Sequence, residues 1–187
     1  FIVRAGAAMV APNESSDEVS TANNLGEFKI DSDTQLGLNF TYMFTDNVAV
    51  ELVAASPFTH KVQLEGVSGE LAEVTHLPPT LLVEYYFGNA QSKLRPYVGV
   101  GVNYTIFFEE DFKTSALGLD NLELSNSVGV AAKVGIDYMI SEKWLMNASV
   151  MYADINTDIE FDSALGHSKI ETDIDPFVYM VSLGYVF

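Results

Sequence analysis

The chain ends in FVYMVSLGYVF, residues 177–187, and this stretch decides the fold class. Its large apolar side chains recur at every second position: Phe177, Tyr179, Val181, Leu183, Tyr185 and Phe187. A period of two predicts a β-strand with two different faces, whereas a helix would repeat about every 3.6 residues. The aromatic face of this strand must contact either a protein core or lipid. The pattern of the other strands distinguishes these two possibilities.

The same alternation recurs along the chain and predicts eight strands, near residues 1–11, 34–44, 48–58, 77–88, 96–107, 127–140, 144–156 and 174–187. The connections alternate strictly in length: the short ones lie at 45–47, 88–95 and 141–143. All turns then lie at one end and all long loops at the other, and an even strand count lets the sheet close without an edge. We therefore expect a single all-β domain over residues 1–187, an eight-stranded antiparallel up-and-down β-barrel.

The acidic residues are concentrated in the long connections. The 187 residues carry a net charge of −17, although 48% of them are hydrophobic. All of this charge lies in residues 12–33, 59–76, 108–126 and 154–175, and the rest of the chain sums to zero. We therefore expect four long acidic loops, at about 12–33, 59–76, 108–126 and 157–173. Such a charge argues against nucleic acid as a partner.

The apolar face of the predicted barrel points outward. In residues 96–107 one face carries valine, tyrosine and isoleucine, and the other is rich in glycine, asparagine and threonine. An eight-stranded barrel is only just wide enough for side chains to fill it, so the small residues suit the lumen. The outer apolar belt suits lipid, where a closed barrel also satisfies its own backbone hydrogen bonds. The chain has no apolar run of about 18 residues, which excludes a transmembrane helix, and no signal peptide is visible.

The same alternation turns five charged side chains into the half of the lumen nearer the short turns: Arg4, Glu51, Glu84, Lys133 and Asp137. Buried charges must be paired or hydrogen-bonded. We therefore expect a salt-bridged plug that sets the strand register and leaves no wide aqueous pore. A catalytic or proton-relay role for these groups is the alternative.

The other half of the lumen is expected to be apolar. Ligand sites are concave and mostly apolar, so these inward positions predict a pocket for a small hydrophobic molecule. The alternative is ordinary packing that keeps a narrow barrel closed. The predicted ligand-lining residues are Val53, Ala55, Leu82, Phe107, Met151, Ile155 and Val178.

Prolines end two neighbouring strands on either side of one long loop, at Pro57 and at Pro78 and Pro79. Proline has no N–H to donate to a neighbouring strand. One hypothesis is a locally unpaired wall that gives a lateral route to the bilayer, and the alternative is a simple end of both strands. Continuous strand pairing down to residue 78 would contradict the lateral route.

Neither catalysis nor a metal site is expected. The histidines, at positions 60, 76 and 167, lie at strand rims or in loops, and no nucleophile–base arrangement can be recognised around them. The zinc-ligand spacing is absent, and the acidic stretches DSD (31–33) and DID (173–175) lack a calcium-loop pattern. We expect no cofactor.

Four stretches closely resemble the OmpW family of outer-membrane proteins: TQLGLNFTYMFTDNVAVELVAASPFTH (34–60), HLPPTLLVEYYFG (76–88), KLRPYVGVGVNYTIFF (93–108) and VGIDYMISEKWLMNASVMYADI (134–155). The resemblance covers nearly the whole chain and is weakest in the first loop and near residues 110–125 and 160–172. It implies a barrel in a Gram-negative outer membrane with extracellular loops, periplasmic turns and a hydrophobic interior channel. Phe187 resembles the C-terminal aromatic residue that such barrels present to their assembly machinery.

The family pattern also places an aliphatic and a bulky aromatic side chain at a constriction of that channel. The matching positions here are Val53 and Met151. Both are smaller or more flexible than the family pattern. This departure argues against a tight constriction here, or for a softer one, because methionine repacks easily.

Transport of small hydrophobic molecules is the predicted function, with outer-membrane lipid and the barrel assembly machinery as partners. One alternative is a structural or receptor barrel with a plugged lumen, whose loops are the functional surface. A soluble lipid-binding barrel of the lipocalin type is the other, but it requires a polar outer face that these strands lack.

Overall fold

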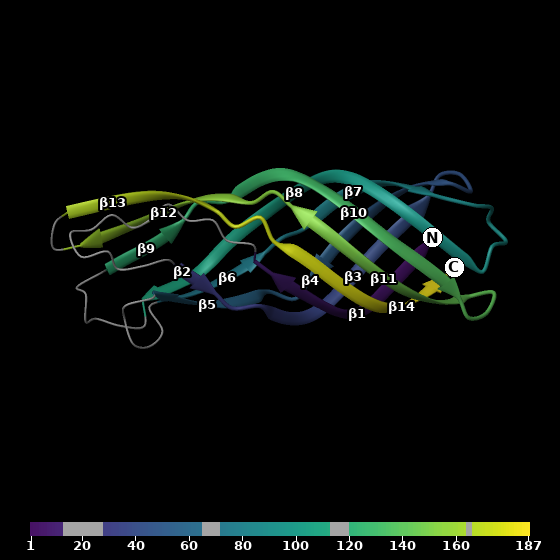
Figure 1. The fold of residues 1–187 in the computed structure, drawn as a ribbon, viewed down its shortest axis with the longest axis horizontal. Helices are drawn as coiled ribbons and strands as arrows, with labels where there is room; N and C mark the ends of the chain where they lie inside the picture. The colour runs from purple at the N-terminus through teal and green to yellow at the C-terminus, as the bar shows by residue number, and fades with distance from the viewer. Residues whose placement is uncertain (13–27, 65–71, 113–119, 164–165) are drawn as a thin grey trace.

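The computed structural model describes residues 1–12, 28–64, 72–112, 120–163 and 166–187, and it confirms the predicted eight-stranded antiparallel barrel (Figure 1). The strands follow the order β10-β11-β14-β1-β3-β4-β7-β8, and β8 pairs with β10 to close the sheet. The barrel strands are β1 (Ile2–Ala11), β3 (Asp33–Met43), β4 (Val48–Ala55), β7 (Thr80–Tyr86), β8 (Leu94–Phe112), β10 (Ser127–Met139), β11 (Trp144–Ala153) and β14 (Phe177–Val186).

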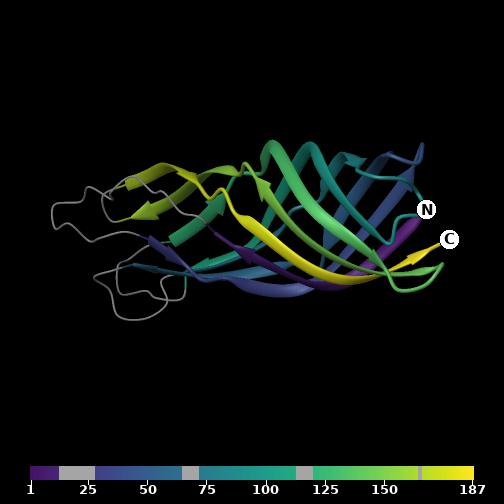
Figure 2. The same ribbon diagram turned by 45° about the vertical axis from the view of Figure 1, so that its right-hand side comes forward.

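The C-terminal stretch forms β14 and joins the two ends of the chain. It pairs antiparallel with β1 from Ile2↔Val186 to Ala11↔Phe177, and with β11 on its other side. Both termini lie at the end of the barrel that carries the short turns, which we call the turn end (Figure 2). The backbone N–H of Phe187 donates to the carbonyl of Phe1 over 2.9 Å.

Strands also form in segments that the sequence analysis assigns to loops, at the opposite or loop end. The short strand β2 (Phe28–Ile30) pairs with β5 (Phe58–Leu64), which pairs with β6 (Ala72–Leu77), and β6 pairs with the long strand β8. A separate three-stranded sheet contains β9 (Asp120–Leu124), β12 (Asn156–Ser163) and β13 (Gly166–Asp173). The predicted loops also contain residues 13–27, 65–71, 113–119 and 164–165, which lie outside the described residues. No helix in the described part of the chain is long and apolar enough to cross a membrane.

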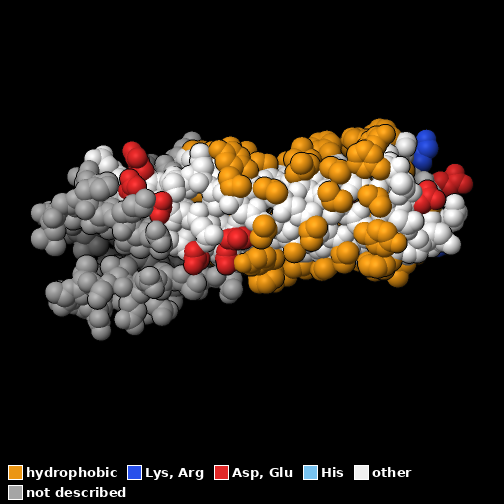
Figure 3. Space-filling model, turned by 90° about the horizontal axis from the view of Figure 1, so that it is seen from above, with side chains coloured by type: hydrophobic (Ala, Val, Ile, Leu, Met, Phe, Trp, Pro, Cys, Tyr) orange, Lys and Arg blue, Asp and Glu red, His pale blue; other side chains and the backbone are white. Residues whose placement is uncertain are grey.

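A belt of exposed apolar side chains surrounds the barrel (Figure 3). Val100, Val128 and Val181 are 68%, 69% and 61% exposed. The acidic and basic side chains visible in Figure 3 lie on either side of the belt rather than within it. This pattern suits a wall that meets lipid between two aqueous surfaces.

The lumen at the turn end is so narrow that glycine is required where large rings cross it. A Cβ atom added to Gly135 would lie 2.3 Å from Cζ of Tyr97. The ring of Tyr97 stacks on that of Tyr86, with 4.8 Å between centroids, and both side chains are buried with Ala49. The inward-facing glycine thus makes room for the aromatic pair that fills this level of the barrel.

Candidate functional site

The structure brings all five predicted lumen charges into one buried network. Arg4 Nη1 lies 2.7 Å from Glu51 Oε2, and Arg4 Nη2 lies 2.6 Å from Asp137 Oδ2. Lys133 Nζ forms an ion pair with Glu51 Oε1 and lies 3.5 Å from Glu84 Oε1. Each of the five residues is at most 3% exposed, so these side chains fill the lumen at their level.

Neutral side chains complete this network. Tyr86 OH accepts a hydrogen bond from Arg4 over 2.8 Å and donates one to Glu84 over 2.9 Å. Thr41 Oγ1 does the same between Arg4 (2.6 Å) and Glu51 (2.9 Å). Thr41 and Tyr86 are not among the five residues predicted for the plug. The alternation of β3 and β7 already indicates that both side chains face the lumen. Which group each hydroxyl binds depends on contacts between distant strands.

A cavity lies on the loop side of the charge network, with about 450 Å³ of empty space that includes its opening to solvent. Its walls are mostly apolar, while its polar side chains come from β3, β10 and β11. The lining residues are Ala8, Gly37, Asn39, Val53, Ala54, Ala55, Phe58, Pro78, Lys133, Ser149, Met151, Val178 and Met180.

Four of the seven predicted ligand-lining residues line this cavity: Val53, Ala55, Met151 and Val178. Leu82 is fully buried and packs with Met151 behind the cavity surface. Phe107 and Ile155 belong to a different apolar cluster, together with Val74 and Ala153. The seven predicted ligand-lining residues therefore fall into three groups: four line the cavity, Leu82 packs behind it, and two belong to a second cluster nearer the loop end.

Two large lining residues, Met180 and Phe58, were not predicted. Met180 has the same parity as Val178 on β14, so the signal was present in the sequence. Phe58 was hidden by a change of phase: β4 turns the odd-numbered Glu51 inward, whereas β5 turns the even-numbered Phe58 and His60 inward. Ser56 and Pro57, between the two strands, absorb this one-residue shift, which exchanges the two faces.

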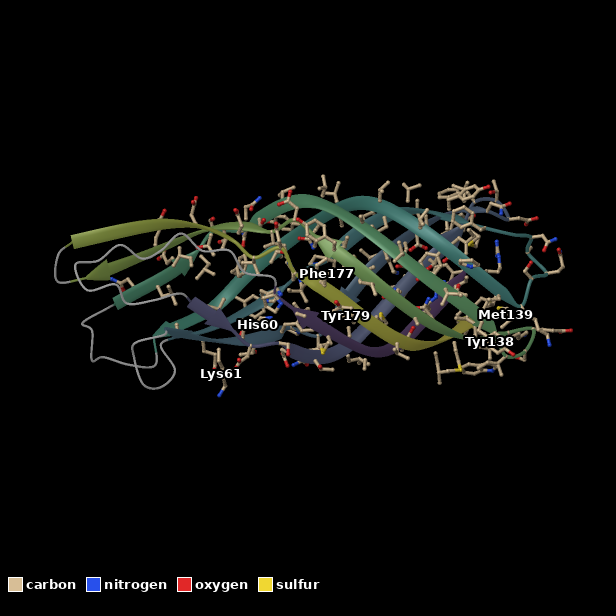
Figure 4. The ribbon with its side chains drawn as sticks, in the orientation of Figure 1. His60, Lys61, Tyr138, Met139, Phe177 and Tyr179 are labelled. Carbon is tan, nitrogen blue, oxygen red and sulfur yellow. The ribbon has the colours of Figure 1, made fainter. Side chains whose placement is uncertain are left out.

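Four aromatic rings form a neck between the cavity and the loop end, and we call them the aromatic neck: Phe58, His60, His76 and Phe107. The ring centroids of His60 and His76 lie 5.0 Å apart, and those of Phe58 and His76 lie 5.7 Å apart. Figure 4 shows His60 and its neighbour Lys61 pointing to opposite sides of β5. The outward face of β5 carries Lys61 rather than an apolar residue, so the neck lies beyond the apolar belt.

Burial lowers the pKa of both neck histidines. Loss of solvation is the main cause, and for His76 the neighbouring His60 adds to it, which brings the pKa of His76 to about 3. His60 Nδ1 lies 2.6 Å from the carbonyl oxygen of Asp31, which partly opposes the shift in the pKa of His60. Both rings are therefore neutral at pH 7.

The barrel wall is interrupted at the prolines. Pairing between β4 and β7 ends at Val53↔Thr80, and pairing between β5 and β6 begins at Phe58↔His76. Within this described stretch, residues 54–57 and 77–79 face each other without strand pairing. On the far side, Tyr104 N donates to the carbonyl of Pro79 over 3.0 Å, so contact with β8 continues. Pro78 lines the cavity, and the interruption therefore lies beside it.

Within the described parts of the chain, no group of three or more histidine, cysteine, aspartate or glutamate side chains is placed to hold a metal ion. Chemically, the lumen provides a charged and hydrogen-bonded floor, an apolar chamber and an aromatic neck.

The whole chain matches known proteins. The model of the OmpW family matches residues 1–187. Outer membrane protein W of Vibrio cholerae serotype O1 is 48% identical over 193 residues, which cover 100% of this chain and 88% of that protein. Outer membrane protein W of Escherichia coli K12 is 47% identical over 189 residues, with the same two coverages.

Solved structures agree with the fold. The crystal structure of the outer membrane protein OprG from Pseudomonas aeruginosa is 44% identical, with a TM-score of 0.91, and the match covers 100% of this chain and 94% of that one. A more distant relative from Pseudomonas aeruginosa is named dibenzothiophene metabolism operon protein PahQ. It is 26% identical over 156 residues, covering 81% of this chain and 71% of the relative.

Proposed function

The chain belongs to the OmpW family and is an outer-membrane barrel of a Gram-negative cell, and from this premise we propose that it passes small hydrophobic molecules through the apolar part of its lumen. In this proposal the four acidic loops are extracellular and the three short turns are periplasmic. The cavity then opens toward the outside of the cell, and a molecule enters it past the aromatic neck.

The observation that carries the proposal is the cavity itself. Its walls are largely aliphatic, as those of small-molecule sites usually are, and it lies directly above the charged floor of the lumen. Met151 and Met180 contribute flexible side chains that adapt to ligands of different shape. Binding here transfers apolar ligand surface from water to an apolar chamber, which favours entry.

The charge network and the wall interruption suggest the route onward. We assign the five buried charges the role of a plug, because they fill the lumen below the cavity and are paired with one another. A bound molecule then leaves sideways, between residues 54–57 and 77–79, where the wall lacks strand pairing. Such an exit delivers it into the apolar layer of the bilayer rather than into water.

The name of the relative PahQ supports the same class of substrate. Dibenzothiophene is a planar, largely apolar molecule of three fused rings.

Probe binding to protein in liposomes tests the proposal, with 1-N-phenylnaphthylamine as the fluorescent apolar probe. Ala55→Phe fills the cavity from its wall. The control is Ala132→Phe, which makes the same change on the exposed outer face of β10. We expect saturable binding by the natural protein and by Ala132→Phe, and about tenfold weaker binding by Ala55→Phe because the chamber is occupied.

Heat-modifiable gel mobility and circular dichroism establish that each variant is folded. Uptake that does not saturate, and that is equal in all three proteins and in empty liposomes, would contradict the proposal. The structural or receptor alternative would then explain the protein better, with the loops as its functional surface.

A further inference from the structure

The cavity differs at its two levels. Its upper walls are apolar, but its floor is lined by the polar residues Asn39, Lys133 and Ser149, from β3, β10 and β11. Asn39 and Lys133 also belong to the charge network below. The cavity therefore has an apolar body above a polar floor, a shape that suits an amphiphilic ligand better than a wholly apolar one.

Asn39 leaves one hydrogen-bond acceptor without a partner at this floor. The residue is fully buried, and its Nδ2 donates to Glu51 Oε1 over 3.0 Å. Its Oδ1 is buried and has no hydrogen-bond partner among the described residues. Reversing the amide would place its oxygen against a carboxylate, so the chemistry of Glu51 sets the orientation. A buried polar atom without a hydrogen-bond partner is uncommon and calls for an explanation. A bound ligand that donates a hydrogen bond to Oδ1 would supply the missing partner.

The floor is unsuited to an anionic ligand head. The network contains three acids and two bases, and the amine of Lys133 already lies between Glu51 and Glu84. A carboxylate placed beside Asn39 would meet an oxygen acceptor and a net negative set of charges. A hydroxyl or an uncharged N–H would instead donate to Asn39 Oδ1.

A second acceptor without a partner lies in the aromatic neck. The contact of His60 Nδ1 with the carbonyl of Asp31 places the ring proton on Nδ1. Nε2 of His60 is then an acceptor, and it is buried with no hydrogen-bond partner among the described residues. The route to the cavity therefore also favours molecules that carry a hydrogen-bond donor.

We propose that the cavity selects amphiphilic molecules with an apolar body and an uncharged hydrogen-bond donor as head group, such as alcohols and phenols, with the head on Asn39. The inference rests on the proposed transport function and names its substrate class. A molecule of the same tail length that carries a carboxylate, or a head that only accepts hydrogen bonds, binds more weakly.

Competition against 1-N-phenylnaphthylamine in the same liposomes tests this inference. The competitors are octanol, octyl methyl ether and octanoate at pH 8, which share one tail and differ in the head. Partition into protein-free liposomes is measured for each, so that membrane concentrations are compared. Octanol should displace the probe at about five- to tenfold lower membrane concentration than the other two, since it alone supplies the missing donor.

Two variants locate the selectivity. Asn39→Ala removes the acceptor and should reduce the preference for octanol to less than about twofold, with each competitor compared at the probe affinity that this variant itself shows. Thr41→Val is the matched control, because Thr41 also donates to Glu51 but does not line the cavity. It should keep the full preference.

The outcomes separate the two proposals. Absence of saturable probe binding overturns the proposed function. Saturable probe binding with equal competition by all three compounds overturns only the donor selectivity. A preference for octanol that survives in Asn39→Ala also overturns it, because the head would then lie elsewhere.

Discussion

Arg4 links the two acidic sides of the lumen network. Its guanidinium is fully buried and contacts Glu51 and Asp137 from opposite edges, and it also bonds to Thr41 and Tyr86. A planar group with five donors can satisfy several acceptors at once, which a lysine at this position could not do. Loss of Arg4 would remove the ion-pair partner of the buried Asp137 and one of the two partners of Glu51.

Arg4→Met should therefore lower the free energy of unfolding by about 3–5 kcal/mol. The double variant Arg4→Met/Asp137→Asn should recover part of this loss, because it removes one unpaired charge while Glu51 keeps Lys133 as its partner. Denaturant titration in lipid vesicles, followed by gel mobility, measures both. An Arg4→Met protein as stable as the natural one would contradict the structural role of the network.

At the scale of elements, the junction between β4 and β5 gives the lumen its neck. The alternation of β4 would place Pro57 inward, but the break at Ser56 and Pro57 shifts the phase by one residue. Phe58 and His60 consequently face the lumen, where they meet His76 of β6. One irregular pair of residues thus converts a strand extension into an aromatic constriction.

Acid should loosen β5 and β6. The pKa of His76 is about 3 in the folded protein and about 6.5 when the ring is exposed, so the open form binds more protons between these values. The stabilising contribution is complete above pH 6.5 and is lost as pH falls through that window. At pH 5 the loss is roughly 2 kcal/mol for His76.

Hydrogen–deuterium exchange of the β5 and β6 amides at pH 7.5 and pH 5 measures this effect, after correction for the intrinsic exchange rates. In the variant His60→Phe/His76→Phe, protection should be independent of pH over this range. Equal protection of the natural protein at both values would show that the two rings do not control the neck.

Strand β14 pairs with β1, which places the last residue of the chain beside the first. The side chain of Phe187 is 75% exposed, and its ring centroid lies 4.8 Å from that of Tyr185 and 6.0 Å from that of Phe1. This position is accessible to an assembly factor. Recognition of Phe187 by the barrel assembly machinery stays a prediction.

At the scale of the whole molecule, the proposed function depends on the order of three features along the lumen. The charge network lies toward the turn end, the cavity lies above it, and the wall interruption opens beside the cavity. In the proposed function, a closed floor next to an unpaired wall directs a bound molecule sideways. None of these features would have this consequence alone.

Restoring strand pairing should slow exit from the cavity without changing affinity. Pro78→Val supplies an N–H donor to the interrupted wall, and an added hydrogen bond contributes about 1 kcal/mol. Pro79 is kept, because its backbone already faces β8, where its carbonyl accepts from Tyr104 N. Transfer of the probe to lipids that carry a quencher, followed by stopped flow, should become about threefold slower or more. Pro96→Val, at the turn end, is the control. A change in affinity with an unchanged transfer rate would contradict the lateral route.

The sequence by itself determined the eight strands, their outer and inner faces and the five charges of the lumen. These properties follow from alternation along the chain, which is local. Only the tertiary structure decided the contacts that Arg4 makes and the division of the predicted lining set, because these depend on register between distant strands. The inward turn of Phe58 also required it, since a one-residue shift at Pro57 leaves no periodic signal. The cavity exists because inward side chains of unequal length, brought together by closure, do not fill every level of the barrel.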